Sequence, residues 1–152
     1  MTIVQEKLKK IVDEHLGPLL KHHGFKKSEK TFVKFSPPYW LVVNVQSSMW
    51  NSASTGKFTV NIARHDTRYD EEPQSKPPKY YEAKPFMPVR IGELISGEDK
   101  WWVLDKHTDA NEVGRELAMI IANKALPCLS EWGTDKAVHW NLSIPETELI
   151  AT

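Results

Sequence analysis

Residues 39–48 read YWLVVNVQSS and residues 57–64 read KFTVNIAR, and these two stretches decide the fold. Both alternate between apolar and other side chains, which is the pattern of a strand that buries one face. The apolar face holds Leu41, Val43 and Val45 in the first stretch and Phe58, Val60 and Ile62 in the second. Burial of both apolar faces against the same layer predicts that the two strands pair within one antiparallel sheet.

Amphipathic helices are predicted on both sides of this strand-rich block. Apolar residues recur at three- and four-residue steps from Val4 to Leu20, with charged residues between them. A kink or a restarted helix is expected at Pro18, because proline lacks the backbone donor that a helix needs. A second helix is expected to begin after Asp109 as N-cap, to kink near Pro127 and to end at Gly133, with a short further helix over residues 134–141.

Shorter strands complete the predicted sheet. We expect one hairpin from residues 25–28 and 31–36, and another from residues 89–95 and 100–104. The resulting fold class is α+β, an antiparallel sheet of about five strands with an N-terminal and a C-terminal helix packed on one face. Residues 65–88 contain five prolines and are expected to form one long loop. A single domain is expected over residues 1–144, followed by a loose C-terminal tail over residues 145–152.

The composition narrows the class of protein. The chain has 152 residues, with 20 Lys and Arg against 20 Asp and Glu, so that the formal charge is zero. This balance makes nucleic acid an unlikely partner. No apolar stretch is long enough to cross a bilayer, so no membrane partner is expected. The only cysteine, Cys128, excludes an internal disulfide and favours a cytoplasmic location.

The charge is nevertheless uneven along the chain. Residues 1–36 contain eight Lys and four acidic residues, whereas residues 91–152 contain five basic and eleven acidic residues. One interpretation is that both sets are spread over solvated faces. The other is a basic N-terminal face that meets a partner or the acidic half of a second copy.

The motifs of common enzyme classes are missing from the sequence. It has no Gly-rich phosphate loop, no nucleophile elbow and no zinc or calcium ligand spacing, so no metal or cofactor is predicted. Cys128 lies on an apolar helix stripe and is expected to be buried and inert. A cluster of His107 with Asp105 and Asp109 is more simply explained by the helix cap at Asp109. No catalytic residue is predicted.

The second face of the central strands is the stronger candidate for function. It is expected to hold Trp40, Asn44, Gln46 and Asn61, with Arg90 joining from the next strand. Amides beside an aromatic ring suit the recognition of a polar surface. We therefore predict a binding site at these five residues on an open, solvated sheet face, the alternative being an ordinary solvated face without a ligand.

Several segments of the chain resemble one known family. They are Leu16-Gly-Pro-Leu-Leu, His23-Gly24-Phe25-Lys26-Lys27, Thr31-Phe32, Asn44-Val45-Gln46 with Ser47, Ser48 and Trp50, Phe58-Thr-Val-Asn61-Ile, Arg90-Ile-Gly-Glu93-Leu, Trp101-Trp102 and Leu126-Pro127-Cys-Leu129. In order and spacing they resemble the bacterial family called domain of unknown function 4304. The resemblance implies a small α+β domain and brings no catalytic residues with it. Residues 65–88 look longer than the usual connection of the family.

These observations favour a cytoplasmic, non-enzymatic binding module, such as an accessory or immunity-like protein that captures another protein. The first alternative is a small hydrolase or transferase built from residues such as Arg64, His65 and Asp105. The second is RNA binding across the sheet by Trp40 and neighbouring rings, which the charge balance disfavours. The sequence determines neither the partner nor the oligomeric state.

Overall fold

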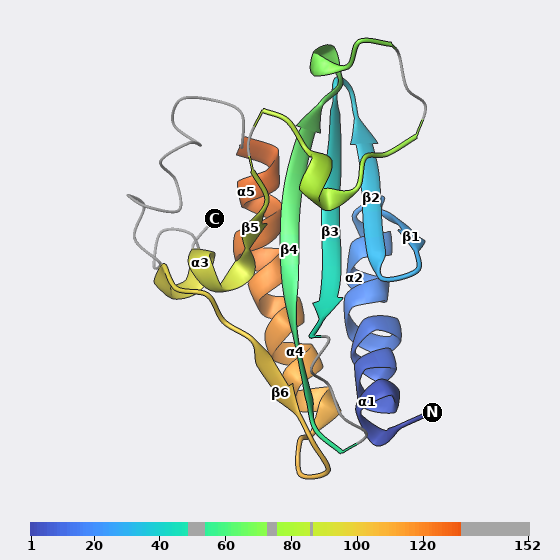
Figure 1. The fold of residues 1–152 in the computed structure, drawn as a ribbon, viewed down its shortest axis with the longest axis vertical. Helices are drawn as coiled ribbons and strands as arrows, with labels where there is room; N and C mark the ends of the chain where they lie inside the picture. Colours follow the sequence, from blue (N-terminus) through green and yellow to red (C-terminus); the bar gives the residue numbers. More distant parts are fainter. Residues whose placement is uncertain (49–53, 73–75, 86, 132–152) are drawn as a thin grey trace.

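The computed structural model describes residues 1–48, 54–72, 76–85 and 87–131. Within them the chain forms two layers, an antiparallel sheet and a layer of helices behind it (Figure 1). The expected α+β class, with N-terminal and C-terminal helices on one face of the sheet, is therefore confirmed. Trp50, the expected helix over 134–141 and the expected tail over 145–152 lie outside the described residues.

The N-terminal helix is continuous but changes its winding before the proline. It consists of α1 (Ile3–Ile11), the π-helical turn η1 (Val12–Leu16) and α2 (Gly17–His22). Thr2 caps α1 with its side chain, and Gly24 ends α2 at a φ of 90°. Pro18 stands in the first turn of α2, where a missing N–H is tolerated. The kink expected at Pro18 thus takes the form of a wider turn just upstream.

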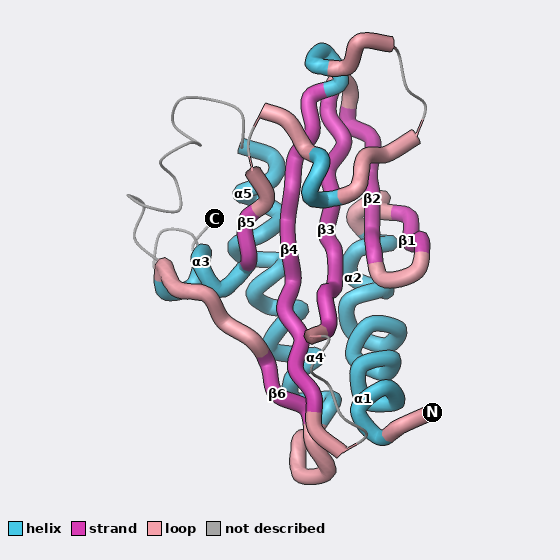
Figure 2. The backbone as a smooth tube through the Cα atoms, viewed as in Figure 1, coloured by secondary structure: helices cyan, strands magenta, loops and turns pink. Residues whose placement is uncertain are grey.

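In the described part of the chain the sheet has six strands: β1 (Lys26–Ser28), β2 (Thr31–Ser36), β3 (Tyr39–Ser47), β4 (Gly56–Asp66), β5 (Val89–Arg90) and β6 (Trp102–Leu104). Their order is β1-β2-β3-β4-β5, and β6 also pairs with β4 (Figure 2). All the pairings are antiparallel. The expected hairpin of the first two strands is confirmed, and β4 is the long central strand that holds both later strands.

The register of β3 and β4 agrees with the predicted faces. Val43 pairs with Ile62 and Val45 with Val60, and all four side chains are buried in the core between sheet and helices. Because paired residues point to the same side of a sheet, the pairing of Asn44 with Asn61 places both amides on the opposite, outer face.

The C-terminal helix packs beside the N-terminal one. It consists of α4 (Ala110–Ile120), the π-helical turn η4 (Ile121–Ala125) and α5 (Leu126–Glu131), and Asp109 caps its start as expected. Gly114 lies directly against His15 of η1: a Cβ at this position would come within 2.3 Å of the imidazole Cδ2. A glycine is therefore what lets the two helices approach this closely.

Two predictions about the second half of the chain are wrong. Residues 91–96 form the helix α3 (Ile91–Ser96) instead of a strand, and β5 and β6 pair with β4 instead of with each other. The expected loop over 65–88 also begins too early, because β4 extends to Asp66. The residues of this segment that the structure describes then form two short 3-10 turns, η2 (Thr67–Tyr69) and η3 (Tyr80–Glu82). Within the described residues, no helix is long and apolar enough to span a membrane.

Candidate recognition surface on the outer face of the sheet

The polar side chains of the outer face form a hydrogen-bonded row across three strands. Asn61 of β4 donates from Nδ2 to Asn44 Oδ1 at 3.2 Å and to Gln46 Oε1 at 2.9 Å, both on β3. Asn44 in turn donates to the Thr31 hydroxyl of β2 at 2.9 Å. The row fixes the orientation of each amide, because every carboxamide has a donor or acceptor partner beside it.

The outer face is not open as predicted. Asn61 is only 3% exposed, so its side chain is a buried structural group and not a solvated one. Val42 and Ala63 on the same face are fully buried although they do not belong to the core under the helices. Residues 76–85, which we call the strap, run across this face, and Tyr80 of η3 approaches Gln46 Oε1 with its hydroxyl at 3.5 Å. Figure 1 shows the strap in front of β3 and β4, on the side opposite the helices.

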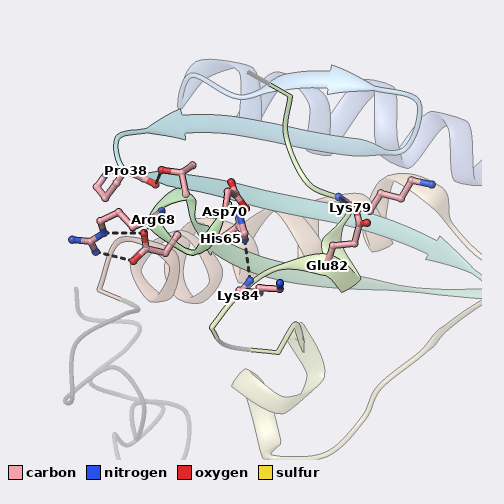
Figure 3. A network of polar contacts seen from close by, with 9 residues as sticks. Pro38, His65, Arg68, Asp70, Lys79, Glu82 and Lys84 are labelled. Carbon is pink, nitrogen blue, oxygen red and sulfur yellow. Dashed lines mark hydrogen bonds and ion pairs between the residues drawn. The ribbon is translucent and has the colours of Figure 1, made fainter. Parts of the chain in front are cut away.

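One histidine holds both ends of the segment that contains the strap. His65 of β4 is 4% exposed. Its Nδ1 accepts a hydrogen bond from the Lys84 backbone N–H at 3.0 Å, and its Nε2 lies 2.8 Å from Asp70 Oδ1 (Figure 3). Because an N–H can only donate, Nδ1 must be unprotonated and the imidazole hydrogen must be on Nε2, which donates to Asp70. Both ring nitrogens are therefore occupied, and the ring is not free to act as a general base.

Backbone contacts add to this attachment. The Asp66 N–H donates to the Lys84 carbonyl at 2.8 Å, and His65 forms an isolated β-bridge with Pro85. The Asp66 carboxylate also accepts from Arg68 Nε at 2.9 Å and Nη2 at 2.7 Å (Figure 3). This paired guanidinium lowers the pKa of the Asp66 carboxyl below its ordinary value, although burial opposes the shift. These contacts hold both ends of residues 67–85, the segment that contains the strap, against the end of β4.

Aromatic rings lie at the exposed margins of the same face. Trp40 is half-buried and packs against Phe35 of β2 with ring centroids 4.7 Å apart, and Phe35 is 48% exposed. The Trp40 indole N–H is buried and has no hydrogen-bond partner among the described residues. Tyr81 of η3, on the strap, is 60% exposed, and Tyr69 of η2, between the end of β4 and the strap, is 54% exposed.

Arg90 joins the face as predicted but is held to one side. It pairs with Asn61 across the β4–β5 ladder. Its guanidinium lies 2.8 Å from Asp99 Oδ2 and 5.0 Å from the centroid of the Trp101 ring. Among the five predicted site residues, the structure thus brings Asn44, Gln46 and Asn61 into direct contact, places Trp40 at one margin and Arg90 at the other.

The residues proposed for an enzyme do not meet. Arg64 and His65 are neighbours on β4 and therefore point to opposite faces. Arg64 is buried on the helix side, where it donates to the Leu129 carbonyl at 3.1 Å and stacks on a tyrosine ring. Asp105 follows β6, which pairs with the far end of β4, and its carboxylate closes a local turn by accepting from the His107 N–H. Each of the three serves a local structural contact.

The remaining chemical candidates are also accounted for by packing. Cys128 is buried, and burial raises the pKa of its thiol to about 12, which keeps it in the unreactive thiol form. Within residues 1–48, 54–72, 76–85 and 87–131, no group of three or more His, Cys, Asp or Glu side chains is placed to hold a metal ion.

Sequence reasoning missed the strap and its rings. Tyr80 and Tyr81 lie in the stretch expected to be a plain loop, and only their adjacency in a charged, proline-rich segment distinguishes them in the sequence. Phe35 was assigned to a strand, and its place opposite Trp40 follows from the hairpin register alone.

Fold and surface together define a small two-layer α+β domain with a polar sheet face under a strap. The family model described as domain of unknown function (DUF4304) matches residues 16–131, and the chain belongs to this family. Comparisons with curated proteins and with solved structures gave no significant match.

Proposed function

We propose that this protein is a cytoplasmic, non-enzymatic binding module that captures another protein through the strap and the margins of the outer sheet face. An accessory or immunity-like role fits such a module. The observation that carries the proposal is the pair of exposed aromatic rings at the outer face, Phe35 beside Trp40 and Tyr81 on the strap, next to a hydrogen-bonded row of amides.

The chemistry of this surface suits a protein partner. Large rings that combine an apolar body with a polar tip are enriched where proteins bind each other, because they bury much area at little cost in rotamer entropy. The buried amide row links the side chains of β2, β3 and β4 beneath the strap, so the rings are presented on a preorganised support. Lys79, exposed beside the Tyr81 ring, adds a donor at the rim, and Arg90 adds another at the opposite margin of the face.

The engagement of Arg64, His65 and Asp105 in structural contacts supports this proposal over the hydrolase or transferase. A catalytic base has to reach the proton that it removes, and both nitrogens of His65 are occupied by other groups.

A capture experiment with matched variants tests the proposal. The wild-type chain, a Phe35→Ser/Tyr81→Ser variant and a Met119→Ser variant are immobilised, and proteins retained from the native cytosol are quantified. Met119 is 65% exposed on α4, so its replacement removes an exposed apolar side chain from the helix side and leaves the outer face intact. We expect one or more proteins to be retained by wild type and Met119→Ser and lost from the double variant. Equal retention by all three chains would contradict the proposal.

A further inference from the structure

A groove lies between the N-terminal helix and the turn of the β1–β2 hairpin, and it shares no lining residue with the strap. Its volume is about 590 Å³, within the range of roughly 300–1,000 Å³ that is typical of ligand sites. The lining residues are Met1, Gln5, Leu8, Lys9, Val12, Asp13, Lys27, Glu29 and Lys30. The groove thus combines an apolar floor with a charged rim.

The apolar part comes from α1 and the turn that follows it. Leu8 and Val12 are 5% and 4% exposed, so they are fixed in the core and offer only a small surface to the groove. Met1, which is 77% exposed, adds a flexible apolar side chain at one end. Such a floor suits a branched aliphatic side chain.

The charged rim has three lysines against two carboxylates, Asp13 and Glu29, and Asp13 already pairs with two of the lysines. Asp13 Oδ2 lies 2.6 Å from Lys9 Nζ, and Asp13 Oδ1 lies 3.0 Å from Lys27 Nζ. Hydrogen bonds from these two ammonium groups lower the pKa of Asp13. The two lysines, one on the helix and one on β1, are therefore spaced to bracket a carboxylate. Lys30 at the turn adds a third ammonium group to the same rim.

The neighbouring sheet edge suits an extended chain. β1 pairs with β2 alone among the described strands, so its other edge faces away from the sheet. A strand edge of this kind can add a peptide segment through backbone hydrogen bonds, while its side chains enter an adjacent groove. The excess of lysine in residues 1–36, eight against four acidic residues, selects for a segment of negative charge.

We propose that this groove binds an extended acidic peptide segment of a partner protein, with an aliphatic side chain on Leu8 and Val12 and a carboxylate between Lys27 and Lys30. In the free protein Asp13 competes with the peptide carboxylate for Lys27. The site is independent of the outer sheet face, so either proposal can fail without the other.

The test uses a short fluorescein-labelled peptide rich in Glu and Leu, whose binding is followed by fluorescence anisotropy. A Lys27→Gln/Lys30→Gln variant should bind it about tenfold more weakly, because two exposed charge pairs are lost. Asp13→Asn should bind it about threefold more tightly, because the internal competitor is removed. Glu14→Gln is the matched control, since Glu14 is exposed on the same helix and outside the groove, and its removal changes the net charge equally.

Two altered peptides test the two parts of the groove separately. A peptide with Gln in place of Glu tests the lysines, a peptide with Ser in place of Leu tests the apolar floor, and each should lose most of the binding. The proposal is overturned if the Glu and Leu peptide does not bind, or if Glu14→Gln tightens binding as much as Asp13→Asn, which would indicate general charge attraction. The proposal is also overturned if decanoate binds to the groove and the peptide does not. It is equally overturned if analytical ultracentrifugation shows that the wild-type chain is a dimer and that Lys27→Gln/Lys30→Gln makes it a monomer. Thermal melts confirm that each variant is folded.

Discussion

Replacing Asn61 by alanine should destabilise the protein although the residue is polar and lies on the outer face of the sheet. The side chain is 3% exposed and donates two hydrogen bonds, at 3.2 Å to Asn44 and at 2.9 Å to Gln46. Each such bond contributes about 1 kcal/mol net, and the void left under the strap adds to the loss, so Asn61→Ala should cost about 2–3 kcal/mol.

Urea unfolding followed by tryptophan fluorescence measures this loss as a lower midpoint at unchanged slope. In a thermal melt the same loss corresponds to a decrease of about 6 °C, since about 1 kcal/mol shifts the Tm of a chain of this size by about 2–4 °C. A double-mutant cycle with Gln46→Ala should give a coupling energy of about 1 kcal/mol, because both residues share one hydrogen bond.

Ser28→Ala is the control, because Ser28 is exposed on β1 and should change stability by less than about 0.5 kcal/mol. If Asn61→Ala were as mild as this control, the amide would be a solvated group. The description of a closed, strap-covered face would then be refuted.

Three further predictions concern the helix layer and the end of β4. Gly114→Ala should destabilise the chain by about 1–3 kcal/mol in urea, because the clash with His15 outweighs a gain of about 1 kcal/mol in helix propensity; an unchanged midpoint would contradict the close helix contact. Cys128 should not react with a thiol reagent until the protein unfolds, because burial raises its pKa to about 12. Arg68→Gln should lower the Tm at neutral pH, and the difference from wild type should disappear in strong acid. Arg68 lowers the pKa of Asp66, so this stabilisation exists above the unfolded-state pKa and is lost as the pH falls through the folded one. A difference that grew in acid would contradict that pairing.

The central strands could be predicted because their signal is local. Alternation in β3 and β4 places Val43 and Ile62 on one face whatever the partner strands are, and the observed register agrees. The same alternation predicted that the amides of Asn44 and Asn61 share the other face. What alternation does not report is whether something covers that face.

The helix α3 was missed because its pattern is short. Ile91, Leu94 and Ile95 follow helical steps, and β-branched residues beside an expected turn favoured a strand instead. Stronger signals were present in Glu93, whose carboxylate accepts from the Arg90 backbone N–H, and in Gly97, which ends the helix at a φ of 76°.

The strap could not be predicted, because its position depends on contacts between distant residues. The backbone N–H of Lys84 in the strap donates to His65 of β4, and the hydroxyl of Tyr80 in the strap approaches Gln46 of β3. No sequence pattern at these residues indicates which residue each of them contacts. The candidate site was therefore predicted in its strands and missed in the segment that presents the exposed rings.

Site-specific photo-crosslinking in living cells tests the proposed recognition surface most directly. A photoreactive phenylalanine analogue is placed at Tyr81 on the strap and, as a control, at Met119 on the helix side, where the exposed fractions are similar. We expect a discrete crosslinked protein adduct from position 81 and none from position 119. Adducts from position 119 alone, or no adduct from either position, would contradict capture through the outer face.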